Sequence, residues 1–117
     1  MCGICGITRG DEKELMRKMS IIQNHRGPDY KNMYFDDYIS LSHQTLSIFK
    51  SNVGIQPISN EDDSIILTCN GEIYNYHSLK EYLEQQGHVF KSDLDVEVIL
   101  HLYEDGLLDS IKKINGM

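Results

Sequence analysis

The sequence lacks the long apolar runs that mark membrane segments and export signals. No stretch approaches the length of about 18 apolar residues that suggests a membrane-spanning helix. The N-terminus also has no basic segment followed by an apolar one, so it does not resemble a signal peptide. We therefore expect a cytoplasmic protein without a membrane partner.

Basic residues are scarce as well. The chain of 117 residues has 11 Lys and Arg against 18 Asp and Glu, which gives a net charge of −7. A nucleic-acid-binding domain normally gathers its basic side chains on one face, and the sequence contains no such cluster. We therefore expect no nucleic-acid partner. A net negative charge favours solubility and indicates nothing more specific about function.

Cysteine is too rare for a disulfide framework. The chain has three cysteines, Cys2, Cys5 and Cys69, and an odd number without an export signal argues against paired disulfides. Cys2 and Cys5 form a C-x-x-C motif, which is typical of a zinc half-site or a redox pair. No second ligand pair follows it, and the histidines are scattered. We therefore expect no metal site, and we rank a redox or zinc protein last among the alternatives.

Apolar periodicity and turn residues predict a mixture of strands and helices. Strands are expected at 2–8, 33–38, 39–49, 64–69, 72–76 and 88–91. Helices are expected at 12–24, from Ser78 to Gly87, from Asp95 to Gly106, and at 107–114. This order favours the α+β class over an alternating parallel fold, and the length suits one small domain.

Several local signals set the predicted boundaries. Asp11 and Glu14 resemble a capping pair for the first helix, with Leu15, Met19 and Ile22 on its apolar face. Ser78 and Glu81 resemble a second capping box. Asn70 and Gly71 lie between two apolar runs, which predicts a hairpin joining 64–69 to 72–76.

The second residue carries distinctive chemistry. A small residue after Met1 normally allows the initiator methionine to be removed, which would leave Cys2 with a thiol and a free α-amine. These groups titrate at about 8.5 and 8 in model compounds, so one residue supplies both nucleophile and base. The alternative is that Cys2 is a buried cysteine acting as a small apolar residue.

Six ordered motifs place Cys2 in a wider pattern. They are MCGICG at the N-terminus, HRGPD at 25–29, SHQTLSI at 42–48, QP at 56–57, NGEIYNY at 70–76 and LDVEVILHLYEDG at 94–106. Together they resemble the glutaminase domain of asparagine synthetases, which are class II glutamine amidotransferases of the N-terminal-nucleophile hydrolase type. The resemblance covers essentially the whole chain. It implies an α+β fold of stacked antiparallel sheets flanked by helices.

The resemblance also implies a role for particular residues. Cys2 would attack the side-chain amide carbon of glutamine, and ammonia would leave. The Asn70 side chain and the Gly71 backbone N–H would stabilise the oxyanion. Asp95 would bind the α-ammonium group of the substrate, with Glu72 as a further contact. Asp93 is a rival for Asp95, although Asp95 has the family spacing to the residues that follow it.

One position departs from the family pattern. The family has H-x-R-L-S-I where this sequence has H-Q-T-L-S-I, so Thr45 replaces the arginine that holds the substrate α-carboxylate. The resemblance implies that the rest of this segment also belongs to the glutamine site: Leu46, Ser47, Ile48 and Phe49. Losing one partner of a charged pair costs roughly 2–5 kcal/mol. We therefore expect weak or absent glutaminase activity, and the alternative function is a non-catalytic binding or regulatory module of the same fold.

The resemblance finally implies what is missing. In the family, the segment matching Gly116 and Met117 is followed by further strands and by a synthetase domain that makes asparagine from aspartate and ATP. Residues 1–117 are expected to be a single, partial amidotransferase domain, incomplete at its C-terminus. No cofactor is expected in this chain, since ATP and magnesium belong to the synthetase domain. The expected partners are glutamine, a synthetase domain or subunit, and a second copy pairing with an unpaired sheet edge.

Overall fold

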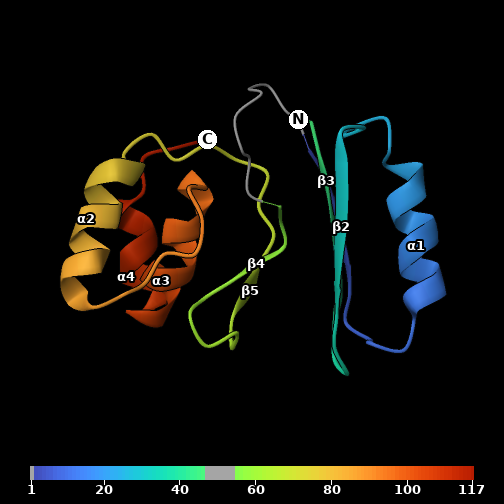
Figure 1. Cartoon of the computed structure of the whole chain (residues 1–117), viewed down its shortest axis with the longest axis horizontal. Helices are drawn as coiled ribbons and strands as arrows, with labels where there is room; N and C mark the ends of the chain where they lie inside the picture. The colour runs from blue at the N-terminus through green and yellow to red at the C-terminus, as the bar shows by residue number, and fades with distance from the viewer. Residues whose placement is uncertain (1, 47–54) are drawn as a thin grey trace. The chain divides into compact units, whose positions relative to one another are not determined.

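The computed structural model describes residues 2–46 and 55–117, except for the side chains of residues 107 and 108 (Figure 1). The chain forms two compact units. The first contains residues 1–57 with 68–70, and the second contains residues 58–67 with 71–117.

The first unit is a three-stranded sheet with one helix. Strand β1 (Gly3–Ile7) leads into helix α1 (Lys13–Ile22), which is followed by strands β2 (Tyr30–Phe35) and β3 (Ser40–Thr45). The strand order is β1-β3-β2, and both pairings are antiparallel. Helix α1 lies against β1 and β3 (Figure 1). The strand at the N-terminus and the helix after it are confirmed.

The buried face of α1 differs from the expected one. Met16 and Ser20 are buried, whereas Leu15 and Ile22 are exposed. Ser20 is buried because it is hydrogen-bonded: the Gln44 amide of β3 donates to both its hydroxyl and its carbonyl oxygen. Apolar periodicity could not reveal this face, since one of its central residues is polar.

The start of α1 is also different from the predicted one. Glu12 occupies the N-cap position, and no side chain caps the helix. The predicted capping pair of Asp11 and Glu14 is therefore wrong. Arg9 lies 3.8 Å from Asp11 and 3.8 Å from Glu12, so the carboxylates before the helix form exposed ion pairs instead.

The second unit combines a short two-stranded sheet with helices. Its elements are β4 (Ile58–Ser59), β5 (Ile66–Leu67), α2 (Tyr76–Gln86), the 3-10 helix η1 (Asp95–Glu97), α3 (Val98–Glu104), α4 (Leu107–Ser110) and the 3-10 helix η2 (Ile111–Lys113). Strands β4 and β5 are antiparallel. The apolar core comes mainly from α2 and from the segment that contains η1 and α3: Leu79, Leu83, Leu94, Val96, Val98, Leu100 and Leu102.

The predicted hairpin at Asn70 and Gly71 is wrong. Strand β5 pairs with β4, not with the segment after Gly71. That segment forms an isolated bridge between Ile73 and Gly116. The backbones of Glu72 and Met117 exchange two hydrogen bonds, of 2.9 and 3.0 Å. The segment after Gly71 therefore pairs with residues about 45 positions further along the chain instead of with β5. A local turn motif contains no information about such a distant partner.

Helix boundaries in this unit follow the prediction only in part. Helix α2 begins at Tyr76 rather than at Ser78, whose hydroxyl donates to the carbonyl of Asn75, so the second capping box is wrong. Gly87 ends α2 in the left-handed region at φ 103°, as predicted. Residues 88–91 form no strand. Gly106 also has positive φ, at 111°, and follows Asp105, the C-cap residue of α3.

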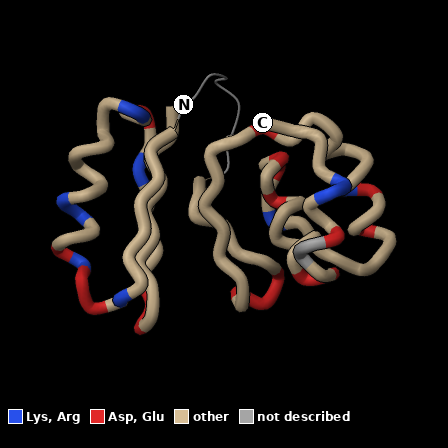
Figure 2. The backbone as a smooth tube through the Cα atoms, turned by 180° about the vertical axis from the view of Figure 1, so that it is seen from behind, with Lys and Arg blue, Asp and Glu red and all other residues tan. Residues whose placement is uncertain are grey.

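The class prediction is confirmed: the fold is α+β with antiparallel sheets. Lys and Arg are spread over several segments rather than gathered along one (Figure 2). Among the described residues, no helix has the length and apolar character needed to cross a membrane.

Candidate active site around Cys2

Two long-range hydrogen bonds fix the backbone of Cys2, which lies just before β1. Its N–H donates to Oδ1 of Asn70 at 3.2 Å. Its carbonyl oxygen accepts a hydrogen bond from Nε of Arg26 at 3.4 Å. Three motifs from separate parts of the sequence therefore meet at one residue: the N-terminal cysteine, HRGPD and NGEIYNY.

The register of the sheet brings Thr45 to the same place. Gly3 pairs with Gln44, so continuing the antiparallel register by one residue places Cys2 opposite Thr45. Tyr30 pairs with Thr45 from the other side. Side chains alternate along a strand, so Gln44 points toward α1 while Thr45 faces the opposite side. The expected orientation of Gln44 away from Thr45 is confirmed.

The HRGPD segment holds β3 as well as Cys2. The N–H of Asp29 donates to the carbonyl of Thr45 at 3.1 Å. Gly27 packs so closely on β3 that a Cβ atom there would overlap the backbone carbonyl of Gln44. A glycine is therefore required at this contact, and the motif joins Cys2 to the strand that carries Thr45.

The segment before Asn70 has its own supports. The Gln56 side-chain oxygen accepts a hydrogen bond from the N–H of Cys69 at 2.7 Å. Nδ1 of His43 lies 2.9 Å from the Thr68 hydroxyl. Burial lowers the pKa of His43, which therefore favours the neutral imidazole at neutral pH. These contacts position the residue whose side chain reaches Cys2.

Cys5 does not form a functional pair with Cys2. The two residues are three apart along an extended segment, so their side chains face opposite sides. The Cys5 thiol contacts the sulfur of Met16 at 3.5 Å in the core. Burial raises the pKa of the Cys5 thiol, so less of it is present as the reactive thiolate at neutral pH. This geometry disfavours the redox and zinc interpretations of the C-x-x-C motif.

The other predicted substrate contacts lie in the second unit. Gly71 and Glu72 follow Asn70 directly and are exposed. Asp95 is half-buried at the start of η1, and its carboxylate accepts a hydrogen bond from the N–H of Ile73 at 2.5 Å. Asp95 forms no side-chain helix cap, because Leu94 is the N-cap residue.

The remaining predicted positions fall into two groups. Asp93 is exposed and lies 3.8 Å from the Lys80 ammonium. Asp95 instead contacts the backbone of the NGEIYNY motif, and its role as the ammonium contact stays a prediction. Leu46 is exposed. Met1 and the predicted contacts Ser47, Ile48 and Phe49 lie outside the described residues.

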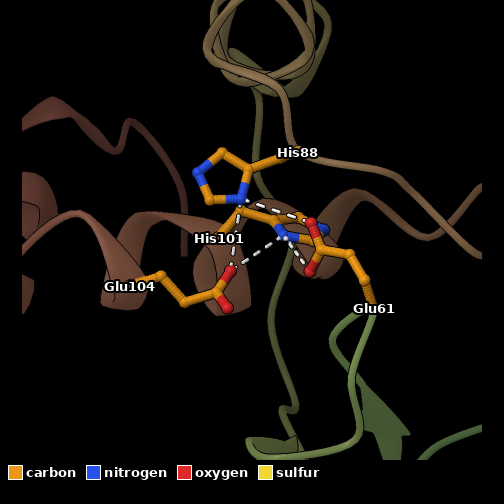
Figure 3. A group of neighbouring side chains, drawn as sticks. All are labelled: Glu61, His88, His101 and Glu104. Atoms are coloured by element: carbon orange, nitrogen blue, oxygen red, sulfur yellow. Dashed lines mark hydrogen bonds and ion pairs between the residues drawn. The ribbon is translucent and has the colours of Figure 1, made fainter.

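Sequence reasoning missed two residues that support the site. Arg26 and Gln56 belong to the motifs HRGPD and QP, but sequence reasoning does not connect either residue with Cys2 or Asn70. The fixed order of the two motifs was the only sign that these residues support the same site. A third feature, a group of His and Glu side chains in the second unit, gave no signal, because its members come from separate segments (Figure 3).

Comparison with known proteins decides the family. The sequence model of the glutamine amidotransferase domain family matches residues 1–117 and so spans both compact units. The chain belongs to this family.

Its relatives are asparagine synthetases. The chain is 42% identical to a probable asparagine synthetase (glutamine-hydrolyzing) of Dictyostelium discoideum, over 99% of the chain and 22% of the relative. It is 36% identical to asparagine synthetase (glutamine-hydrolyzing) 1 of Bacillus subtilis, over 100% of the chain and 20% of the relative. A putative asparagine synthetase (glutamine-hydrolyzing) 1 of Methanocaldococcus jannaschii is 42% identical, over 95% of the chain and 24% of the relative. The chain thus spans about a fifth of the length of these relatives.

Proposed function

We propose that this domain hydrolyses the side-chain amide of glutamine, with Cys2 as the nucleophile. The observation that carries the proposal is the hydrogen bond of 3.2 Å between the Cys2 nitrogen and Oδ1 of Asn70. Once Met1 is removed, this nitrogen is an α-amine and can still donate the same bond. The amine is then held beside the thiol whose proton it accepts.

Asn70 is suited to a second role in the same step. Its Oδ1 atom is occupied by Cys2, so the two hydrogens on Nδ2 are the groups that can donate to a developing oxyanion. The backbone N–H of Gly71, the next residue, is the second proposed donor. Arg26 acts as a positioning residue. Its hydrogen bond to the Cys2 carbonyl fixes the orientation of the backbone at Cys2, just before β1.

The proposed reaction has two halves. The Cys2 thiolate attacks the amide carbon of glutamine and forms a tetrahedral intermediate. The C–N bond then breaks as the α-ammonium of Cys2 returns its proton to the leaving nitrogen, which releases ammonia and leaves a thioester. Water, deprotonated by the α-amine, attacks the thioester and releases glutamate and the thiol. Asp95 and Glu72 are proposed to bind the α-ammonium end of glutamine.

The names of the relatives support a role in a larger protein. Each of the three is named as a glutamine-hydrolyzing asparagine synthetase. We propose that the ammonia passes to a synthetase domain or subunit that forms asparagine from aspartate and ATP. Magnesium and ATP would be bound by that partner.

An activity assay tests the glutaminase proposal. Protein shown by intact mass to lack Met1 is incubated with glutamine, and glutamate and ammonia are measured. We expect equal amounts of both products, and none from Cys2→Ala. The matched control is Cys5→Ala, which removes a thiol on the opposite face and keeps turnover. Product release that survives Cys2→Ala would contradict the proposal.

Thr45 supports a second candidate, a glutamine-binding or regulatory module without turnover. It lies opposite Cys2 on β3, where a neutral hydroxyl cannot provide the charged fork that holds a carboxylate. This alternative predicts a folded, Met1-free domain that binds glutamine by calorimetry but releases no product. Turnover that depends on Cys2 would exclude it.

A further inference from the structure

The second unit contains a group of four side chains that the proposed glutaminase reaction does not use. We call it the His–Glu cluster: Glu61, His88, His101 and Glu104 (Figure 3). Glu61 comes from the β4–β5 loop, and His88 follows the end of α2. The other two residues lie one turn apart on α3. One ligand atom from each of the four lies within 4.8 Å of all the others.

The spacing of these atoms suits a four-coordinate metal ion. Nδ1 of His88 lies 3.4 Å from Glu61 and 3.2 Å from Glu104. Nδ1 of His101 lies 3.4 Å from Glu61 and 3.3 Å from Glu104. Bonds of about 2.0–2.1 Å at tetrahedral angles put neighbouring ligand atoms roughly 3.3–3.4 Å apart. The two contacts of Glu104 Oε2 with the imidazole nitrogens match that separation, and Glu61 reaches the two nitrogens through its two different oxygens.

The second nitrogen of each imidazole faces another carboxylate. Nε2 of His88 lies 3.4 Å from Asp105, and Nε2 of His101 lies 3.7 Å from Glu97. Metal-bound histidines almost always have such a partner for the other ring N–H, which fixes the ring and raises its basicity. Nε2 of His88 has such a partner, whereas the 3.7 Å contact of His101 is too long for a hydrogen bond and leaves its buried Nε2 without one among the described residues. Both rings present Nδ1 to the two glutamates of the cluster.

The two glutamates are oriented as well. The backbone N–H of Val89 donates to Glu61 at 2.9 Å, and the Asn60 amide donates to Glu104 at 2.6 Å. Both bonds go to Oε1. This leaves Oε2 of Glu104 for its two imidazole contacts, whereas Oε1 of Glu61 is also the atom that lies 3.4 Å from His88 Nδ1. Outer hydrogen bonds therefore hold Glu61, Glu104 and His88, which is a feature of built metal sites rather than of chance surface groups.

Charge balance favours a cation between the four residues. Glu61 and Glu104 bring two negative charges toward each other, and His101 beside them is fully buried. The imidazole rings of His88 and His101 lie beside each other, with their centroids 4.9 Å apart. A divalent ion would neutralise the charge of both carboxylates. The mixed nitrogen and oxygen ligands suit zinc, whereas magnesium and calcium prefer oxygen alone.

We propose that the His–Glu cluster binds one zinc ion through the two Nδ1 atoms and the two carboxylates. The ion would join the β4–β5 loop, the end of α2 and α3. Its role would be structural, since the four protein ligands fill a tetrahedral shell. This inference departs from the expectation that the chain needs no metal.

Titration of the tag-free full chain tests the proposal. The protein is stripped with a chelator and titrated with zinc chloride by calorimetry, and its melting temperature is followed. We expect one equivalent bound and a higher melting temperature, with neither effect from magnesium or calcium at the same concentration. Cobalt(II) should give the strong visible absorption of a tetrahedral ion, without a thiolate charge-transfer band. A stripped chain that shows no saturable zinc binding would overturn the proposal.

Variants then locate the ion. His88→Gln and Glu61→Gln should each weaken zinc binding more than 100-fold, and Asp105→Asn, which removes only an outer partner, by about 10- to 100-fold. The matched control is His77→Gln, an exposed histidine of α2 outside the cluster, which should bind zinc as the parent does. Unchanged binding in His88→Gln and Glu61→Gln, both folded by circular dichroism, would overturn the proposal. If either variant fails to fold, the cobalt spectrum of the parent decides: a thiolate band or an octahedral spectrum contradicts the site.

Discussion

Thr45→Arg should strengthen glutamine capture if the missing carboxylate clamp limits this domain. Thr45 lies opposite Cys2 on β3, and it is held there by pairing with Tyr30 and by the N–H of Asp29. An arginine at this position could offer its planar fork to the α-carboxylate of a substrate whose amide is at Cys2.

The expected size follows from the cost of leaving one charge without its partner, roughly 2–5 kcal/mol. At about 1.4 kcal/mol for each tenfold change, KM for glutamine should fall between about 30-fold and several thousand-fold. Because the new contact is made equally in the ground and transition states, kcat should change little. Thr45 is buried, so the larger side chain should also lower the free energy of unfolding by about 1–3 kcal/mol.

Steady-state glutamate release measures KM and kcat, and calorimetry on the Cys2→Ala background measures glutamine binding without turnover. Thr45→Lys supplies a charge without the fork and should recover only part of the gain. Thr45→Met supplies length without charge and should recover none. A folded Thr45→Arg protein that binds glutamine no better than the parent would refute the reasoning.

Two further predictions concern the first unit: one tests the close packing of Gly27 on β3, and the other tests the hydrogen bonds of Asp36. Gly27→Ala should lower the free energy of unfolding by about 1–3 kcal/mol and reduce turnover, because its Cβ would overlap the Gln44 carbonyl. Chemical denaturation measures this. Gly6→Ala is the milder control, because its Cβ would lie 3.0 Å from the end of the flexible Leu41 side chain and at an ordinary 3.6 Å from the Ser40 carbonyl. An equal effect in both would contradict it. Asp36 accepts backbone N–H bonds from Ile39 and Tyr38, which lower its pKa. Its stabilisation is present above the unfolded pKa and is lost as pH falls through the lower folded value. The difference in melting temperature between the parent and Asp36→Ala should therefore shrink from neutral pH to below about pH 3. A constant difference would contradict it.

The sequence predicted elements whose signals are local. Gly87 and Gly106 both have the positive φ that ends a helix, and both are predicted because each follows a run of apolar residues at helical spacing. The strand at Gly3–Ile7 and the α+β class were also correct. Such signals work because they depend on a few neighbouring residues and on the conformational freedom of glycine.

The failures share a physical cause, which is competition from distant partners. The hairpin at Asn70 failed because Ile73 bridges to Gly116 instead. The predicted face of α1 failed because Ser20 is buried through hydrogen bonds with β3. The position of Cys2 in the site required a resemblance to a known family, since no spacing rule connects it with Arg26 or Asn70.

The central claim is that Cys2 is a glutamine-directed nucleophile held by Asn70 and Arg26. Its most direct test is intact-mass analysis after treatment with 6-diazo-5-oxo-norleucine, a glutamine analogue that alkylates such cysteines. We predict one adduct per chain, located on Cys2, formed only in molecules without Met1 and slowed by excess glutamine. Modification of Cys5 or Cys69 at the same rate, or no adduct on a folded Met1-free chain, would contradict the account.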